Sequence, residues 1–506
     1  MSPNTRAFLR SAATLSLTAT ALRAASVVFG AAVARRVGAE AMGLFSLVGS
    51  VSGFSVTLAV SGVYLAVTRM VAEALGRGRE GEARRALRHA LLYALFFGSV
   101  ATVSLFFLAP LLGGRVLRDA RTVPSLRLFS LSLCPVALAT VWQGWCTAAG
   151  RVRRLAVGQA AEQCARMLLV WRLVSRAAAS GAEAACVALV AGGALADGLS
   201  CAYFALGHLL EFAVKGGGIK EKPSFSIIRR LFRIAGPVAL SAYVRSALLA
   251  VEHALIPSAV SRHGRTRKQA LSDYGELQGM ALPVVLFPGA LLYPAAGLLI
   301  PAFSERCVRG ERESIRRLCG RVMEATLAFS VLCLLLFAAC SRPLGRLLYA
   351  SDTAGRYILV LSFVLPVMFC DHVADCMLKG LGDEVWCMWV NILDAALSIF
   401  LVLLLLPRMG AVGYAVVIII AEIVNFSLSF WRLERRCDYR PAPARHLVLP
   451  ALCALFAYLA VTALWPPAPS AGVCSLVVRM TALSGAYLLF LFGFSVLSAR
   501  RASRAR

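Results

Sequence analysis

Long apolar stretches alternate with short, arginine-rich polar stretches along the whole chain. A helix needs about 20 apolar residues to cross the hydrocarbon core of a bilayer, because it rises about 1.5 Å per residue. The pattern therefore predicts an all-α integral membrane protein with about fourteen transmembrane helices and no separate extramembrane domain. The expected helices cover residues 7–34, 42–67, 89–112, 124–148, 156–175, 183–212, 231–257, 277–303, 320–341, 355–380, 383–407, 411–431, 446–466 and 474–498.

Composition supports a membrane protein and excludes several other classes. Of the 506 residues, 59% are hydrophobic and the mean hydropathy is +0.74, beyond what soluble domains show. The net charge of +27 comes from short clusters between apolar segments, which indicates membrane orientation and no nucleic-acid binding. The 15 cysteines show no spacing typical of a zinc site, and we interpret them as packing residues. No catalytic constellation occurs, so we expect no enzyme.

The distribution of positive charge predicts the orientation. With both termini in the cytoplasm, 33 of the 53 Lys and Arg residues fall inside, 16 fall outside and four fall within spans. This bias follows the positive-inside rule. We therefore expect a multi-pass protein of the cell membrane with both termini cytoplasmic.

A weak internal repeat predicts two halves. Residues 10–23 resemble residues 233–245: each has a basic start, a helix of small residues and then an arginine within the span. Transporters built from such repeats place their binding site between the repeats. We expect one six-helix bundle at 1–212, a cytoplasmic linker at 213–230, a second six-helix bundle at 231–432, and two additional helices with a basic tail at 433–506. Prolines clustered between 237 and 301 mark the expected hinge.

Charged residues inside three of the expected spans are the main functional signal. They occur in residues 158–171, 236–257 and 366–406. A charge at membrane depth costs a few kcal/mol or more, so such residues usually face a bundle interior or a wet cavity and mark a transport path. The sequence therefore favours a transporter with a charged central cavity.

A series of short motifs runs through most of the chain, at residues 34–45, 62–73, 159–166, 251–257, 274–288, 299–301, 378–382 and 412–414. In their order and spacing, these motifs resemble the MOP (multidrug/oligosaccharidyl-lipid/polysaccharide) exporter superfamily, and within it the stage V sporulation protein B branch of lipid-linked glycan flippases. The branch usually has an acidic Pro-Glu after the apolar run of the eighth helix, whereas this chain has Pro301-Ala302.

The resemblance implies two six-helix bundles that face each other in a V, two further helices at the C-terminus, and alternating access. It implies flipping of a lipid-linked oligosaccharide or cell-wall precursor, a polyprenyl-diphosphate glycan. A diphosphate can cross the membrane only where cations replace its water, and the guanidinium group matches phosphate oxygens. Arg23 and Arg245, at like positions of the two halves, are the leading headgroup candidates, although both could also be structural; Arg36, Arg69 and Arg166 are further candidates.

Acids in the same spans could take part in coupling. Glu162 could pair with the arginine four residues later or line the cavity, and Glu252 could take a proton or Na⁺. Asp371 and Asp375 lie four residues apart on one helix face, and Asp394 follows in the next expected span. These acids could hold a coupling Na⁺ or H⁺, or neutralise arginines across the cleft. We expect no other cofactor. The expected partners are membrane lipid and the glycan lipid, and the protein is expected to be a monomer.

The rival function on the same fold is a cation-coupled multidrug antiporter of the MATE type. A cationic drug needs acids and aromatic residues with few buried arginines, whereas an anionic headgroup needs arginines in both halves. The arginines within the spans favour the flippase.

Overall fold

The computed structural model describes residues 3–215, 225–262, 264, 266–439, 448–464 and 472–504. These residues form helices joined by short connections and include no β-strand, so the all-α prediction is confirmed. The described chain divides into two compact units, Met1–Gly275 and Glu276–Arg506, which we call unit 1 and unit 2.

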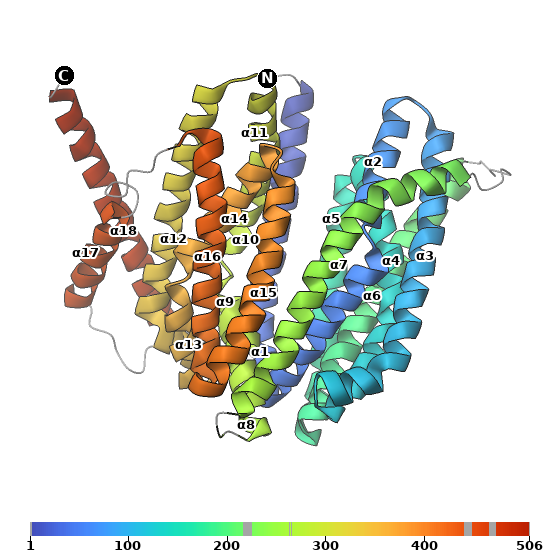
Figure 1. Ribbon diagram of the computed structural model, residues 1–506, viewed down its shortest axis with the longest axis horizontal. Helices are drawn as coiled ribbons and strands as arrows, with labels where there is room; N and C mark the ends of the chain where they lie inside the picture. Colours follow the sequence, from blue (N-terminus) through green and yellow to red (C-terminus); the bar gives the residue numbers. More distant parts are fainter. Residues whose placement is uncertain are drawn as a thin grey trace. The chain divides into compact units, whose positions relative to one another are not determined.

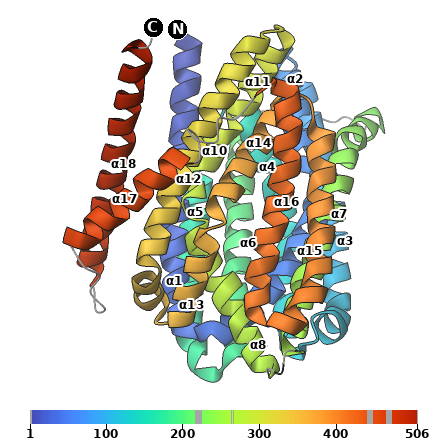
Figure 2. The same cartoon turned by 60° about the vertical axis from the view of Figure 1, so that its left-hand side comes forward.

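The helices of unit 1 and unit 2 are labelled in Figures 1 and 2. Unit 1 contains α1 (Pro3–Val60), α2 (Val63–Gly76), α3 (Glu80–Leu111), α4 (Val123–Ala148), α5 (Val152–Ala177), α6 (Ala182–Lys215), α7 (Phe225–Ser261) and α8 (Arg267–Tyr274). Unit 2 contains α9 (Leu282–Val285), α10 (Gly289–Gly297), α11 (Leu299–Val308), α12 (Arg312–Tyr349), α13 (Asp352–Ser362), α14 (Leu365–Gly380), α15 (Glu384–Met409), α16 (Ala411–Cys437), α17 (Leu449–Leu464) and α18 (Val473–Arg504).

Each of the fourteen predicted spans contains a helix of the structure. In the described chain, eight helices are long and apolar enough to cross a membrane, or up to ten if each of two bent pairs is one span. Helix α1 contains the first predicted span and most of the second, whose last residues lie in α2. Between the two spans lies Gly38, where φ is 82° and ψ is 170°. Helices α5 and α7 are long but carry several charged residues, and α17 is shorter, so the total of fourteen stays a prediction.

Unit 1 is held together by close packing among α1, α3, α4, α5 and α6. Helix α7 packs on α1, α2 and α3 of the same unit. The rings of Tyr93 and Phe232 meet edge to face at 5.0 Å, the Tyr93 hydroxyl donates to the Ser61 carbonyl at 3.1 Å, and the Ser61 hydroxyl bonds the Tyr243 hydroxyl. The predicted bundles differ from this division because they place α7 in the second half. Their boundary at 213–230 stays a prediction.

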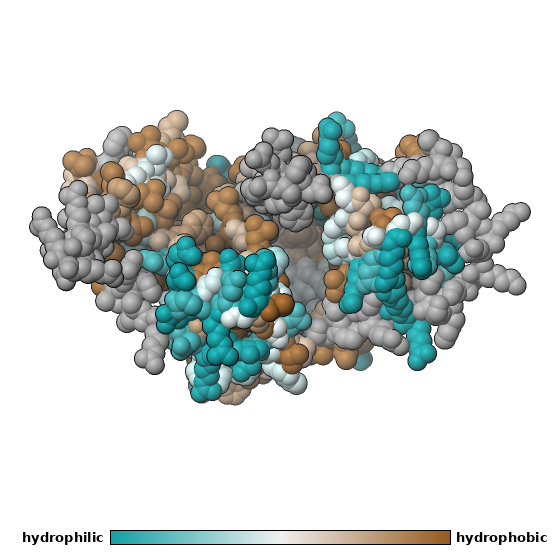
Figure 3. Space-filling model, turned by 90° about the horizontal axis from the view of Figure 1, so that it is seen from above, coloured by the Kyte–Doolittle hydropathy of each residue, from teal (hydrophilic) through white to brown (hydrophobic). Residues whose placement is uncertain are grey.

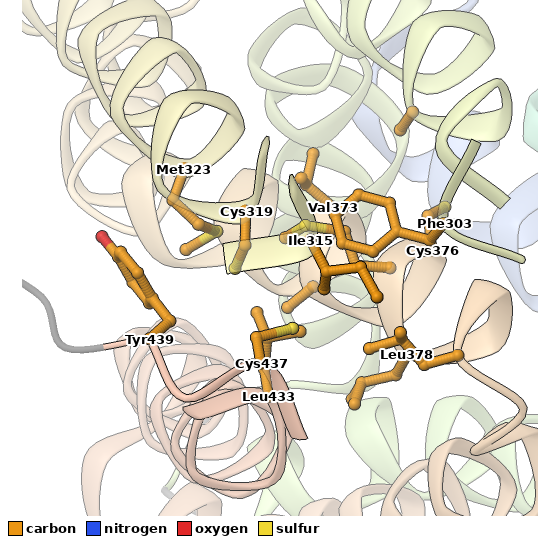
Figure 4. Packing of buried hydrophobic residues seen from close by; sticks show 14 of the residues in the cluster. Phe303, Ile315, Cys319, Met323, Val373, Cys376, Leu378, Leu433, Cys437 and Tyr439 are labelled. Atoms are coloured by element: carbon orange, nitrogen blue, oxygen red, sulfur yellow. The ribbon is translucent and has the colours of Figure 1, made fainter. Parts of the chain in front are cut away.

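Unit 2 has an apolar core where α11, α12, α14 and α16 meet (Figure 4). Phe303, Val373 and Leu433 are almost fully buried there, and Cys319 and Cys437 are buried among them. Thiols in such surroundings act as small apolar residues, as expected from the sequence. Helices α17 and α18 pack on α12 (Figures 1 and 2). The buried hydroxyl-bearing side chain of Tyr487, on α18, donates a hydrogen bond to the Ala328 carbonyl of α12 at 2.9 Å.

Two of the predicted spans are bent. The helical stretches Arg267–Val285 and Gly289–Val308 meet at 61°, and Pro288 lies in the break between them. The pair Asp352–Ser362 and Leu365–Gly380 meets at 52°, with Pro366 in the first turn of the second helix. Proline removes a backbone hydrogen bond and clashes with the preceding turn, which explains both bends. The first bend lies within the region expected to be a hinge.

An ionic clamp fixes one end of α15 to α16. Asp383, which precedes α15 and is buried, accepts hydrogen bonds from Arg432 at 3.0 and 3.1 Å and from Arg436 at 2.5 and 3.0 Å. Burial alone would raise the pKa of Asp383, but the hydrogen bonds and charges of Arg436 and Arg432 outweigh it and hold the pKa below its usual value. The ionised carboxylate therefore stabilises the folded protein.

We expect Asp383→Asn to lower the stability at pH 7 by about 2 kcal/mol, because two arginines lose a charged acceptor. A lowered pKa contributes stability above the unfolded-state pKa, and this stability is lost as the pH falls through the folded-state pKa. The difference in unfolding temperature between the two proteins should therefore shrink below about pH 4. Thermal unfolding in detergent over a pH series measures this difference.

The matched control is Asp352→Asn, since Asp352 is 62% exposed and pairs with the exposed Arg346. Its effect should stay below about 1 kcal/mol. A difference for Asp383→Asn that grows on acidification would contradict the clamp.

Candidate functional site

Unit 1 contains a cavity of about 300 Å³ between α1, α4, α5 and α6. Most of its lining is apolar, including Phe29, Phe45 and Val170. Its polar residues come from three helices: Ser26 and Ser52 of α1, Gln163 and Arg166 of α5, and Asp197 of α6. An apolar cavity with a few convergent polar groups is the usual form of a binding site.

Arg166 lies between two carboxylates at this cavity. One of its terminal nitrogens, Nη2, donates to Glu162 at 3.0 Å and to Asp197 at 2.6 Å. Glu162 also accepts a hydrogen bond from the Ser200 hydroxyl at 2.7 Å. The predicted pairing of Glu162 with Arg166 is therefore confirmed. With all three groups ionised, one positive charge faces two negative charges, so the cluster has a formal excess of one negative charge.

Helix spacing and small residues bring this cluster together. Glu162 and Arg166 are four residues apart on α5, which places them on one face. Gly192 lets α6 approach α5, because a Cβ there would lie 2.6 Å from the side chain of Val170. This close approach brings Asp197 within reach of the guanidinium group. Asp197 was not among the residues predicted from the sequence, although a carboxylate within an apolar span is itself a signal.

Unit 2 contains a second polar cluster, centred on Asp371 and Asp375 of α14. Both acids are buried, and they contact residues of α15 and α16. Asn425 of α16 donates to Asp371 at 3.1 Å. Asp375 accepts from Ser429 of α16 at 3.4 Å, from Lys379 at 3.3 Å and from Asn391 of α15 at 3.4 Å. The two predicted acids therefore belong to one interior cluster.

This cluster has unused oxygen atoms and an excess of negative charge. In the described part of the chain, Asp371 Oδ1 and Asn425 Oδ1 are buried and accept no hydrogen bond. Asp394 of α15 is half-buried and near enough to interact electrostatically with Asp371. Among the described residues, Asp371 and Asp375 share one cation, Lys379, which pairs with Asp375 at 3.3 Å. Carboxylate and amide oxygens suit hard cations, so the arrangement can accept a proton or a small monovalent ion.

The remaining predicted residues lie outside these two clusters. Arg36 is exposed and stacks on Trp171, with its guanidinium carbon 5.2 Å from the ring centre. Arg69 is exposed and pairs with Glu73 at 3.1 Å. Arg245 is exposed on α7, Glu252 is buried on the same helix, and the side chain of Arg23 lies outside the described residues. The structure therefore brings together Arg166 and Glu162, and Asp371, Asp375 and Asp394. Among the described side chains, those of Arg36, Arg69 and Arg245 do not join these clusters.

The chain is a multi-pass membrane protein with the fold of known lipid and drug transporters. A lipid II flippase, MurJ, in an inward closed conformation superposes with a TM-score of 0.70, covering 97% of this chain and 99% of that chain at 13% sequence identity. A multidrug resistance transporter of the MATE family and MOP superfamily, in an inward-facing conformation, gives a TM-score of 0.64 at 14% identity, over 83% of this chain and 96% of that chain. At these identities the likeness concerns the fold.

The chain belongs to the polysaccharide biosynthesis protein family, whose model matches residues 8–306. It is 22% identical to stage V sporulation protein B of Bacillus subtilis (strain 168) over 405 residues, which are 78% of this chain and 77% of that protein. It is 19% identical to the sporulation protein YkvU of the same organism over 372 residues, which are 72% of this chain and 82% of that protein. The resemblance to the MOP superfamily is thereby confirmed.

Arg166→Met should destabilise unit 1, because Glu162 and Asp197 would then face each other without a cation. We expect a loss of about 2 kcal/mol, since the site is only partly buried. Adding Asp197→Asn should recover part of the loss by removing the repulsion. Thermal unfolding of the purified variants measures both steps.

Arg172→Met serves as the control, because Arg172 is exposed on the same helix. The ion cluster would have no structural role if the two arginine variants unfolded at the same temperature. A further loss on adding Asp197→Asn would contradict the repulsion.

Proposed function

We propose that this protein moves a lipid-linked oligosaccharide or cell-wall precursor, a polyprenyl-diphosphate glycan, across the cell membrane by alternating access. The observation that carries this proposal is membership of the polysaccharide biosynthesis protein family over residues 8–306. The similarity to stage V sporulation protein B and the fold shared with a lipid II flippase support it. The protein makes and breaks no covalent bond in this role and acts as a monomer in the lipid bilayer.

The chemistry of the cargo decides which arginines contact it. A diphosphate loses its hydration on leaving water, and only fixed cations can compensate for that loss. Arg166 already serves two carboxylates, so its role is to hold α5 and α6 together. Arg245 presents an exposed guanidinium group within a predicted span, and Arg23 occupies the like position of the first half. We assign the diphosphate to these two residues, with Arg36 and Arg69 as further contacts.

The two acid clusters serve coupling. Each carries an excess of carboxylate within a predicted span, and uncompensated negative charge in hydrocarbon is costly. Binding of Na⁺ or H⁺ removes that excess. Loading and unloading of the cation at Asp371 and Asp375 would then favour different states of unit 2, because the cation binds one arrangement of α14, α15 and α16 better than another.

A second function, cation-coupled export of drugs as in the MATE type, is favoured by one observation. Both interior clusters of the described chain have more carboxylates than cations, which suits a positively charged substrate. Under that alternative, the acids would bind the cargo itself. Transport assays with anionic and cationic cargo separate the two functions.

Arg245→Ala should lower the rate of transport of a fluorescent polyprenyl-diphosphate glycan in proteoliposomes by about tenfold or more, because the headgroup loses a charge-assisted hydrogen bond. Arg23→Ala should have a similar effect. Arg245→Lys should retain part of the rate, since the charge remains but the bidentate geometry is lost. Initial rates with inverted and right-side-out vesicles measure the effect.

The control is Arg309→Ala, which removes an exposed arginine that pairs with Glu305. Normal transport by both Arg23→Ala and Arg245→Ala would refute the headgroup assignment. Efflux of an organic cation, with no movement of the diphosphate lipid by the native protein, would establish the MATE-type function instead.

Asp371→Asn and Asp375→Asn should abolish the response of transport to an imposed gradient of Na⁺ or H⁺, while leaving slow, ungated movement of the lipid. The amide keeps the shape of the side chain but removes the charge that the cation neutralises. Rates measured with and without each gradient identify the ion. An undiminished response in both variants would place coupling elsewhere.

A further inference from the structure

Unit 2 contains a second, open cavity of about 640 Å³, distinct from the acid cluster. It lies between the connection from α11 to α12, the first turns of α12, and the C-terminal end of α16. Its charged lining consists of four arginines and two acids, Arg312, Arg316, Arg435, Arg436, Glu313 and Asp438. The formal charge of the lining is therefore +2.

Two of the four arginines form ion pairs with described residues. Arg316 pairs with Glu313 at 2.9 Å, and Arg436 belongs to the clamp on Asp383. Arg312 and Arg435 form no ion pair with any described residue. The guanidinium carbon of Arg435 lies 3.9 Å from the ring centre of Trp431, and this stacking positions the group at the cavity.

The start of α12 adds to the positive potential. Arg312 is the first residue of this 38-residue helix, whose first backbone amides have no partner within the helix. These amides and the helix dipole favour an anion beside them. Two arginines and a helix N-terminus thus converge on one cavity.

Tryptophans near the cavity indicate the depth of the lipid headgroups. Trp386 and Trp431 lie with ring centres 5.7 Å apart on α15 and α16, and Trp389 is 61% exposed. Tryptophan gathers where the hydrocarbon core meets the headgroup region. Val308, beside the cavity lining, is 87% exposed, so the cavity opens at the surface of the protein. Seen from above, Figure 3 shows hydrophilic residues gathered on unit 2, with hydrophobic residues nearby.

We propose that this cavity binds the phosphate headgroup of an anionic phospholipid from the surrounding bilayer. The phosphodiester is the anionic partner of Arg312 and Arg435, and its acyl chains lie along the apolar surface near the exposed Trp389. Basic pockets between transmembrane helices on the cytoplasmic side bind anionic lipids in this way. The predicted orientation places 306–321 and 432–445 on that side. The lipid links α12 to α16 and is separate from the transported cargo.

Purified full-length protein in nanodiscs provides the test, with phosphatidylcholine alone or mixed with phosphatidylglycerol. We expect phosphatidylglycerol to raise the unfolding temperature and to remain bound in native mass spectra. The double variant Arg312→Ala/Arg435→Ala should lower its affinity by about thirtyfold. Arg312→Lys/Arg435→Lys should keep much of the affinity and shows that the effect follows charge even if the alanine variant folds poorly.

The matched control is Arg317→Ala, one residue beyond Arg316 but outside the cavity lining, and it should bind phosphatidylglycerol as the native protein does. Equal lipid binding by the native protein and the double alanine variant would overturn the proposal. So would equal losses in the double variant and Arg317→Ala. If inorganic phosphate in phosphatidylcholine nanodiscs gave the full stabilisation, the site would be one for a free anion and the lipid assignment would fail.

Discussion

The cost of an unpartnered charge in hydrocarbon governs the interior of both units. In unit 1, the cation Arg166 is held by carboxylates from α5 and α6. In unit 2, Asp371 and Asp375 are surrounded by amide, hydroxyl and ammonium groups from three helices. Buried polar groups need such partners, and the partners must come from neighbouring helices when the lipid offers none. The pairing of polar groups in this protein therefore depends on how closely the helices pack. Gly192 lets α6 approach α5, and this proximity allows Asp197 to meet the guanidinium group of Arg166.

Pairing does not neutralise either interior. Each cluster retains more carboxylates than cations, and Asp371 keeps a buried oxygen without a donor among the described residues. A purely structural network would be expected to satisfy every group, because partly satisfied buried networks are unfavourable. Residual negative charge inside a membrane protein is instead typical of a site that exchanges protons or ions. A cavity in unit 2 has the opposite excess, since four arginines and two acids line it.

The sequence predicted the helices well because apolar stretches of sufficient length have few alternatives in a bilayer. It also predicted the contact between Glu162 and Arg166, since a spacing of four residues on a helix determines which side chains meet. It could not predict that Asp197 joins them, because that depends on how closely α6 approaches α5. Nor could it show that Arg36 stacks on Trp171, or that Asp383 is held by two arginines about fifty residues later in the chain. Such contacts depend on tertiary packing, which the periodicity of one chain does not encode.

The break at Gly38 has a mechanical consequence. With φ of 82° and ψ of 170°, this residue has a backbone conformation that is essentially restricted to glycine. A Cβ there would touch nothing, so the restriction comes from the backbone itself and not from crowding. The two long arms of α1 are thus joined by a single non-helical residue, with no intervening loop. Any residue with a Cβ would be strained in this conformation, so replacing Gly38 would change the angle between the two arms without a clash with any neighbour.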